Sequence, residues 1–167
     1  MKDYLSLVDR NTRGRCDVTP LFADREAFSQ LADDLAKPFL GSDIDAVVAI
    51  DALGFILGTA IAERLEVGLV PARKGGKLPV ETIREAFVDY TGDEKALELR
   101  PDALKPGATA LIVDEWIETG AQVSAAIALV ERAGARVAGI AAINVDRCPA
   151  TDALRKQYTV HTVWEDA

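Results

Sequence analysis

The chain has 167 residues, with 19 Lys and Arg against 27 Asp and Glu, which gives a formal net charge of −8 at pH 7. A single domain spanning residues 1–167 is expected at this length, with a core that needs neither disulfides nor a metal. The acidic charge argues against nucleic acid and anionic membranes as partners, and no apolar stretch is long enough to span a membrane or to form a signal peptide.

The cysteines and the histidine exclude further classes of protein. Cys16 and Cys148 lie far apart in the sequence, and His161 is the single histidine. These residues cannot supply the roughly four ligands of a structural zinc site, and they argue against Ser-His-Asp or Cys-His catalysis. Free thiols are typical of the reducing cytoplasm, where we expect the protein to reside.

The predicted elements alternate between helices and strands. Asp24 is typical of a helix N-cap, and apolar residues recur at helical spacing from there to Phe39, with Pro38 and Gly41 marking the end. Residues 46–50 are a continuous apolar run, which is typical of a strand buried on both faces. The later elements are expected to be helix 55–66, strand 68–72, a hairpin of strands 84–91 and 96–100, strand 110–113, helix 121–133, strand 137–145, helix 151–157 and strand 160–164.

This alternation indicates an α/β fold, a doubly wound and mainly parallel sheet flanked by helices. In such sheets, ligands bind at the carboxyl ends of the strands. Polar or glycine-rich loops leave the predicted strands at 51–58, 73–79 and 114–122. We therefore expect the functional residues in these loops.

Residues 111–122 carry the clearest functional pattern. A buried strand runs into the adjacent carboxylates Asp114 and Glu115, and Thr119 and Gly120 then open a helix. A helix N-terminus favours a phosphate group, whereas carboxylates accept hydrogen bonds from the paired hydroxyls of a ribose. The pattern predicts a phosphoribosyl group as ligand; the alternative is an ordinary strand-to-helix turn with solvated acids. The nucleotide-binding patterns G-x-x-x-x-G-K-[ST] and G-x-G-x-x-G do not occur in the chain.

Several segments together resemble one known family, the type I phosphoribosyltransferases. The segment 111–122 resembles the phosphoribosyl-pyrophosphate motif of that family, and 70–79 resembles its adenine subgroup most closely. Further similarity lies at 17–21, 54–58 and 102–107. The resemblance therefore covers the chain from about residue 17 to residue 145.

The resemblance implies a fold and an activity. A small N-terminal hood and helix would occupy residues 1–40, and a flap hairpin at 80–100 would close over the site, with a solvated hairpin as the alternative. The family transfers the phosphoribosyl group of phosphoribosyl pyrophosphate to a base such as a purine, giving a nucleoside monophosphate and pyrophosphate, with Mg²⁺ carried on the pyrophosphate. A cytoplasmic homodimer that acts on these small molecules, and on neither nucleic acid nor membrane, is the corresponding expectation.

The resemblance also implies roles for individual residues. Those implied in binding phosphoribosyl pyrophosphate are Asp114, Glu115, Thr119, Gly120, Ala121, Gln122, Ser124, Ala52, Leu53, Arg73, Lys74 and Lys77. Those implied in binding the base are Cys16, Asp17 and Val18, and those implied in catalysis are Glu118 and Asp89. No residue is assigned to a protein-bound metal.

The chain departs from the family pattern at several of these positions. Leu53 and Cys16 replace arginines, with Arg15 or Arg13 as candidates to compensate beside the base. Glu118 replaces an alanine, and 6-oxopurine members carry an acidic residue at that place. We hypothesise that Glu118 is a general acid or base. A first-turn acid favoured by the helix dipole is the alternative.

These departures leave more than one function open. A purine phosphoribosyltransferase is the leading hypothesis. Leu53 and Gln122, the latter in place of a threonine, also fit a non-catalytic or regulatory homologue that binds phosphoribosyl pyrophosphate or a nucleotide. The altered base pocket alone would fit transfer to a non-purine acceptor.

Overall fold

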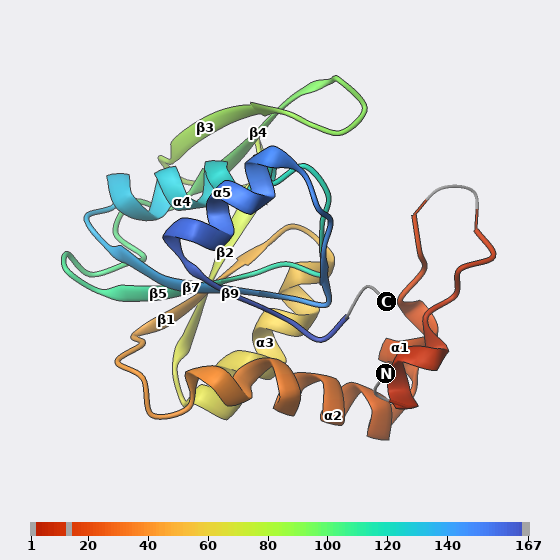
Figure 1. The fold of residues 1–167 in the computed structure, drawn as a ribbon. Coiled ribbons are helices and arrows are strands. Elements are labelled where there is room, and N and C mark those ends of the chain that lie inside the picture. Colours follow the sequence, from red (N-terminus) through yellow and green to blue (C-terminus); the bar gives the residue numbers. More distant parts are fainter. Residues whose placement is uncertain (1–2, 13–14, 165–167) are drawn as a thin grey trace.

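The computed structural model describes residues 3–12 and 15–164. Its centre is a seven-stranded sheet in the order β3-β4-β2-β1-β5-β7-β9, seen edge-on in Figure 1. Neighbouring strands from β2 to β9 are parallel, and β4 and β3 extend the sheet in antiparallel orientation. The strands are β1 (Ala46–Ile50), β2 (Gly68–Lys74), β3 (Ile83–Val88), β4 (Glu94–Leu99), β5 (Thr109–Val113), β7 (Arg136–Ala142) and β9 (Thr159–Thr162).

Strand β1 shows why this sheet forms. All five of its residues are buried. Ala46, Val48 and Ile50 enter one hydrophobic cluster, and Val47 and Ala49 enter a second cluster. Because side chains alternate between the faces of a strand, an uninterrupted apolar run buries both faces at once.

Helices cover both faces of the sheet (Figure 1). The helices α2 (Arg25–Ala36) and α3 (Leu53–Leu65) pack on one face, and α4 (Ala121–Arg132) and α5 (Pro149–Gln157) lie on the other. The Asp24 carboxylate accepts the Ala27 N–H at 2.8 Å, which confirms the predicted N-cap of α2. No helix within residues 3–12 and 15–164 is long and apolar enough to cross a membrane.

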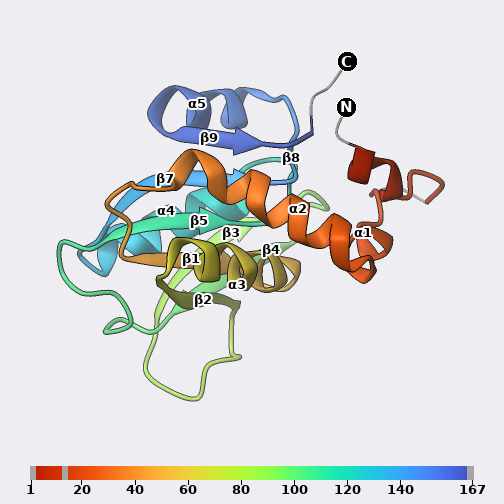
Figure 2. The same ribbon diagram turned by 90° about the horizontal axis from the view of Figure 1, so that it is seen from below.

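The N-terminal segment lies at the end of the sheet where the parallel strands finish. It contains η1 (Asp3–Leu7), α1 (Thr19–Ala23) and an antiparallel bridge between Asp9 and Asp17. Figures 1 and 2 show α1 beyond the start of α2, and Figure 1 places the turn between β3 and β4 toward the same end. The hood, the parallel strand ends and the hairpin turn can therefore contribute to one site, although the division of the chain into hood, core and flap stays a prediction.

Two differences between the observed elements and the sequence-based expectation bear on the site. The predicted strand 137–145 is split at Ile143, and β8 (Asn144–Val145) leaves the main sheet to pair with β6 (Trp116–Ile117). The Ile143 N–H donates to the Glu115 carbonyl at 3.0 Å, so the split follows from a contact with a distant loop. In the hairpin, the turn is longer than Thr91-Gly92-Asp93, because the Asp89 N–H donates to the carbonyl of Asp93 at 2.9 Å.

Candidate functional site

The loop that joins β5 to α4 is held firmly against the neighbouring strands. The Asp114 N–H donates to the Ala141 carbonyl at 3.2 Å, and the Glu115 carbonyl accepts the Ile143 N–H at 3.0 Å. The short ladder between β6 and β8 adds further pairing. The loop is thus an extension of the sheet, which fixes the directions of the side chains that follow Asp114.

Gly120 sets the entry into α4. Its φ of 77° lies in the left-handed region, and it occupies the N-cap position. A side chain there would lie 3.1 Å from Leu154 Cδ1 and 3.3 Å from Thr151 Cγ2, so the space for a side chain is also tight. The Ala121 N–H donates to Thr119 Oγ1 at 3.4 Å. The remaining N–H groups of the first turn and the dipole of this twelve-residue helix suit an anion.

Asp114 is a buried carboxyl beside a second acid. Its side chain is 3% exposed, and its Oδ1 accepts the Glu115 N–H at 2.9 Å. Burial raises the pKa of Asp114 well above its ordinary value, and the neighbouring Glu115 carboxyl adds to this effect, while Arg15 opposes it. A side chain at Gly54 would lie 2.9 Å from the Val113 carbonyl, so the start of α3 packs directly against the end of β5. The acid pair is therefore rigidly seated at the centre of the carboxyl edge.

The loop and the hairpin turn together line a pocket. Most of its lining residues belong to the predicted site, and Tyr90, Trp116, Ile117 and Val123 complete it. The lining consists of Asp89, Tyr90, Asp114, Trp116, Ile117, Glu118, Thr119, Gly120, Ala121, Gln122 and Val123. Ser124, whose N–H donates to the Gly120 carbonyl at 2.9 Å, lies outside this lining and is exposed on α4.

Arg15 connects the hood to both walls of the pocket. Its Nε lies 2.8 Å from Glu118 Oε1, and its guanidinium carbon lies 5.1 Å from the centre of the Tyr90 ring. Burial raises the pKa of Glu118, the Arg15 charge opposes that rise, and the carboxylates of Asp146 and Glu115 reinforce it. Glu118 can therefore exchange a proton closer to neutral pH than an ordinary glutamate can.

Trp116 forms an aromatic wall next to Glu118. Its ring centre lies 5.6 Å from that of Trp164, and its Nε1 donates to Asp146 Oδ1 at 3.1 Å. The guanidinium of Arg10 covers Trp164 at 4.5 Å. These contacts hold one edge of the Trp116 indole while the residue lines the pocket.

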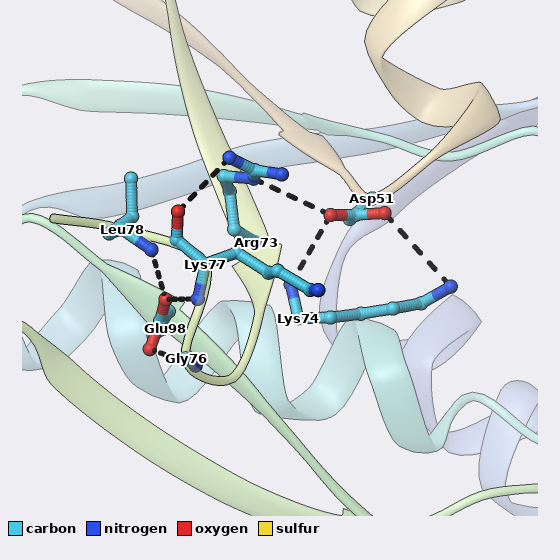
Figure 3. Close-up of polar contacts among 7 residues, drawn as sticks. All are labelled: Asp51, Arg73, Lys74, Gly76, Lys77, Leu78 and Glu98. Carbon is cyan, nitrogen blue, oxygen red and sulfur yellow. Dashed lines mark hydrogen bonds and ion pairs between the residues drawn. The ribbon is translucent and has the colours of Figure 1, made fainter.

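Asp51 and the basic segment after β2 form a second group at the same edge of the sheet (Figure 3). Arg73 Nε lies 3.6 Å from Asp51 Oδ2, and Lys74 Nζ lies 4.0 Å from Asp51 Oδ1. Arg73 also donates to the Lys77 carbonyl at 3.1 Å. The peptide bond between Asp51 and Ala52 is cis. The structure thus brings Arg73 and Lys74 together at the end of β1, and their role in binding phosphoribosyl pyrophosphate stays a prediction.

Glu98 supports the turn of this basic segment from below. Its carboxylate accepts the N–H groups of Gly76, Lys77 and Leu78 at 2.8, 2.7 and 2.6 Å (Figure 3). Burial alone would raise the pKa of Glu98, but the three donors outweigh it and the pKa is lowered. The carboxylate therefore stays ionised and holds the loop in one shape.

Asp89 is engaged by its own turn. Its Oδ1 accepts the Thr91 N–H at 2.9 Å, the Thr91 hydroxyl at 2.6 Å and the Asp93 N–H at 3.1 Å. The hydrogen bond from the Thr91 hydroxyl is the main reason why the pKa of Asp89 is lowered. Of the two predicted catalytic acids, only Glu118 has a raised pKa, whereas Asp89 is held as an anion.

The predicted base-binding residues and Leu53 occupy structural positions. Leu53 and Cys16 pack against the hydrophobic cluster of α2 and α3, and Val18 is buried in it. The Asp17 carboxylate accepts the N–H and the hydroxyl of Thr19 at 2.9 and 2.6 Å, at the start of α1. These four residues are not among those that line the pocket within the described part of the chain. Their binding roles stay predictions.

Sequence reasoning missed the supporting residues around the site. Asp51 follows directly after a predicted strand, which was a usable signal, and Trp116 lies inside the motif. Glu98 carried no such signal, because its partners are distant in the sequence. Arg15 was a candidate beside the base, but its contact with Glu118 was not foreseen. Arg13 lies outside the described residues. Within residues 3–12 and 15–164, no group of three or more His, Cys, Asp or Glu side chains could hold a metal ion.

This combination defines a class of protein. A parallel sheet that places an acid pair, a glycine-opened helix N-terminus and a basic loop at one carboxyl edge is an α/β protein built to bind a phosphorylated sugar. Residues 22–163 match the model of the phosphoribosyl transferase domain family. The chain belongs to this family.

Relatives of known name agree with this assignment. The chain is 45% identical over 144 residues to adenine phosphoribosyltransferase of Paracoccus denitrificans, which covers 84% of this chain and 76% of the relative. The crystal structure of adenine phosphoribosyltransferase from Rhodothermus marinus is 35% identical, with a TM-score of 0.84 and 96% of each chain covered. That of Saccharomyces cerevisiae, complexed with an imino-altritol bisphosphate and adenine, is 28% identical, with a TM-score of 0.79 and 96% of this chain and 98% of that chain covered.

The comparisons confirm the predicted family, the α/β fold class and the prediction of a phosphoribosyltransferase enzyme. They give no support to the alternative of a non-catalytic binding protein.

Proposed function

We propose that this protein transfers the phosphoribosyl group of phosphoribosyl pyrophosphate to a purine base, giving a nucleoside monophosphate and pyrophosphate in a salvage reaction. The observation that carries the proposal is the buried acid pair at the end of β5, followed by the N-terminus of α4 opened by Gly120. Adenine is the first candidate base, because the relatives are named for it and the yeast relative is complexed with it.

The loop from β5 to α4 would hold the ribose and its phosphate. Asp114 and Glu115 would accept hydrogen bonds from the ribose hydroxyls, which keeps the sugar in place while its C1 becomes electron-deficient. The 5-phosphate would bind at the first turn of α4. The residues proposed for this cradle are Thr119, Gly120, Ala121, Gln122 and Ser124. Support comes from the lining of the pocket, in which all of these except Glu115 and Ser124 take part.

The loops that follow β1 and β2 would bind the pyrophosphate. Arg73, Lys74 and Lys77 supply positive charge, and the backbone at Ala52 and Leu53 adjoins them through Asp51. Mg²⁺ would arrive bound to the pyrophosphate as part of the substrate and neutralise charge on the leaving group. The protein then has to bind the magnesium complex rather than a bare metal ion.

Glu118 would handle the proton that leaves the purine nitrogen. We expect Glu118→Gln to lower kcat/KM about tenfold or more and to remove the acidic limb of its pH profile. As a base, Glu118 is active when ionised, so activity falls as the pH drops through its raised pKa. Arg15→Gln removes an opposing charge and should move that limb to higher pH. Unchanged turnover of Glu118→Gln on every accepted base would refute the role.

Pyrophosphate release tests the proposed function. Purified protein is given phosphoribosyl pyrophosphate, Mg²⁺ and, in parallel, adenine, guanine, hypoxanthine, xanthine and pyrimidines. We expect release that depends on one or more purines. Asp102→Asn is a matched control for substitutions of Asp114, because Asp102 is an exposed aspartate that is paired with Arg100. Release with pyrimidines alone would point to the non-purine alternative, and no release from folded protein would contradict the proposal.

We also propose a homodimer that works in the cytoplasm. Both cysteines are free thiols, which suits a reducing compartment. Several large apolar side chains are exposed, among them Leu40, Ile56 and Val80, and a second copy would cover some of them.

A further inference from the structure

A second cavity adjoins the pocket at the hairpin. It encloses about 540 Å³, which is in the range of small-molecule sites. It shares Asp89, Tyr90 and Gln122 with the pocket of the β5–α4 loop, so the two spaces are neighbours. The lining of the second cavity, called here the hairpin cavity, consists of Arg15, Lys74, Gly75, Arg84, Phe87, Asp89, Tyr90, Lys95, Ala96 and Gln122.

The hairpin cavity is basic although the protein is acidic. Four cationic residues line it, namely Arg15, Lys74, Arg84 and Lys95, and Asp89 is the one carboxylate among the lining residues. The whole chain carries a formal net charge of −8. Positive charge gathered in a cavity against the net charge of the chain indicates an anionic ligand.

Arg84 and Lys95 bring this charge from the hairpin. Arg84 lies opposite Glu98 in the ladder of β3 and β4, and its guanidinium passes close to Gly75, where an added side chain would lie 3.4 Å from it. The Glu98 carboxylate accepts three backbone N–H groups, and the Arg84 charge helps to lower its pKa, so Arg84 faces this carboxylate as well as the cavity. Lys95 Nζ lies 3.9 Å from Oδ2 of Asp89, whose side chain is largely buried, and 3.2 Å from Asp93 Oδ2, in a pair whose side chains are exposed. Such exposed pairs are weak and exchange readily for a phosphate group.

Position 53, beside the proposed pyrophosphate site, carries no positive charge because it is a leucine. The Leu53 side chain packs against the hydrophobic cluster of α2 and α3. Lys74 lines the hairpin cavity and also pairs with Asp51, two residues before Leu53. The hairpin cavity is therefore next to the loop from which that positive charge is missing.

We propose that Arg84 and Lys95 bind the pyrophosphate group of the substrate and supply the charge that Leu53 does not. This inference rests on the proposed function and extends it to two residues outside the family motifs. Arginine presents a planar fork of donors that matches phosphate oxygens, and lysine adds a point charge. Gln122, at the first turn of α4, joins the hairpin cavity to the phosphate cradle.

Calorimetric titration with magnesium pyrophosphate tests the inference without any base or turnover. We expect Arg84→Gln and Lys95→Gln each to weaken binding about tenfold, and the double variant to weaken it about a hundredfold. Arg100→Gln is the matched control, because Arg100 follows β4 but lies outside the hairpin cavity and pairs with Asp102. It should bind within about twofold of the wild type.

The fold should survive these substitutions. Arg132 donates to the backbone carbonyl of residue 84 at 2.9 Å, and that contact does not need the Arg84 side chain. Thermal melting of each variant checks this, and Arg84→Lys, which keeps the charge but loses the fork, should bind with intermediate affinity.

The outcomes separate this inference from the proposed function. Binding of Arg84→Gln and Lys95→Gln that matches the wild type, or no binding by the wild type, would overturn the inference, whatever the turnover. Loss of binding in both variants would support it even if every base in the turnover assay failed, a result that would contradict the proposed function instead.

Discussion

Replacing Asp114 by Asn is expected to lower turnover by two orders of magnitude, about 100-fold, while making the protein more stable at neutral pH. The carboxylate is proposed to hold the ribose hydroxyls, so its loss should act mainly on kcat. Asparagine keeps the oxygen that accepts the Glu115 N–H and offers an amide to the Glu115 carboxylate. It also removes a charge that is buried at 3% exposure.

The stability difference should depend on pH. Because folding raises the pKa of Asp114, the stabilisation from its protonated form is present at low pH and is lost as the pH rises through the folded-state pKa. Asp114→Asn lacks this loss, so its advantage in melting temperature should grow as the pH is raised from the acidic range, where both forms are neutral, toward the alkaline range.

Asp102→Asn is the control for this pH dependence. Arg100 lowers the pKa of Asp102, so the ionised form of Asp102 stabilises the fold as the pH rises, which is the opposite of Asp114. The melting temperature of Asp102→Asn should therefore not rise above that of the wild type with increasing pH. Full turnover of Asp114→Asn, or a melting temperature below the wild type at the upper end of the pH range, would contradict the account of this residue.

Replacing Gly120 by Ala is expected to raise the KM for phosphoribosyl pyrophosphate about tenfold and to lower the unfolding free energy by about 2 kcal/mol. The φ of 77° is unfavourable for alanine, and the added methyl group would meet Leu154 at 3.1 Å and Thr151 at 3.3 Å. Whether the backbone changes its φ or shifts away from Leu154 and Thr151, the N–H groups at the start of α4 move away from the phosphate. Steady-state kinetics and denaturant unfolding measure the two effects.

Gly107→Ala is the matched control for this substitution. Gly107 has a similar φ of 79°, and an added side chain there would meet nothing within 4 Å. It should share the backbone cost of about 1 kcal/mol and leave the KM unchanged. Equal KM values for the two variants would show that the start of α4 does not bind the substrate phosphate.

The sequence carried enough information to predict the centre of this fold. The apolar run 46–50 coincides with β1 (Ala46–Ile50), because a strand buried on both faces needs an uninterrupted apolar stretch. The N-cap at Asp24 and the helix opened by Gly120 were also predictable, because local backbone chemistry determines them.

Features that depend on distant partners were not predictable. The split of strand 137–145 follows from the bond between Ile143 and the Glu115 carbonyl. Glu98 alternates like a solvent-facing strand residue, and only the fold shows that three N–H groups of the basic loop surround it. Arg84 and Lys95 are likewise ordinary polar strand residues until the hairpin is placed beside Lys74.

The candidate site likewise contains features that local sequence predicts and features that depend on distant partners. The pocket around Asp114 and Gly120 gathers residues that are close in the sequence, and most of its lining residues belong to the predicted set, whose binding roles stay predictions. The contact of Arg15 with Glu118 joins the hood to that loop across about a hundred residues, and no local pattern encodes it. Cys16 and Val18, by contrast, are small apolar residues of a kind often found in protein cores. Val18 is buried in the hydrophobic cluster, and Cys16 packs against it.

The measurement that tests the central claim most directly is product analysis of a single reaction with adenine, phosphoribosyl pyrophosphate and Mg²⁺. Chromatography and mass spectrometry would follow the nucleoside monophosphate and the pyrophosphate together. The account predicts that both appear in equal amounts at the wild-type rate and that Asp114→Asn forms them about 100-fold more slowly. If pyrophosphate appears without nucleotide, or if Asp114→Asn matches the wild type, the proposed transfer at this site is wrong.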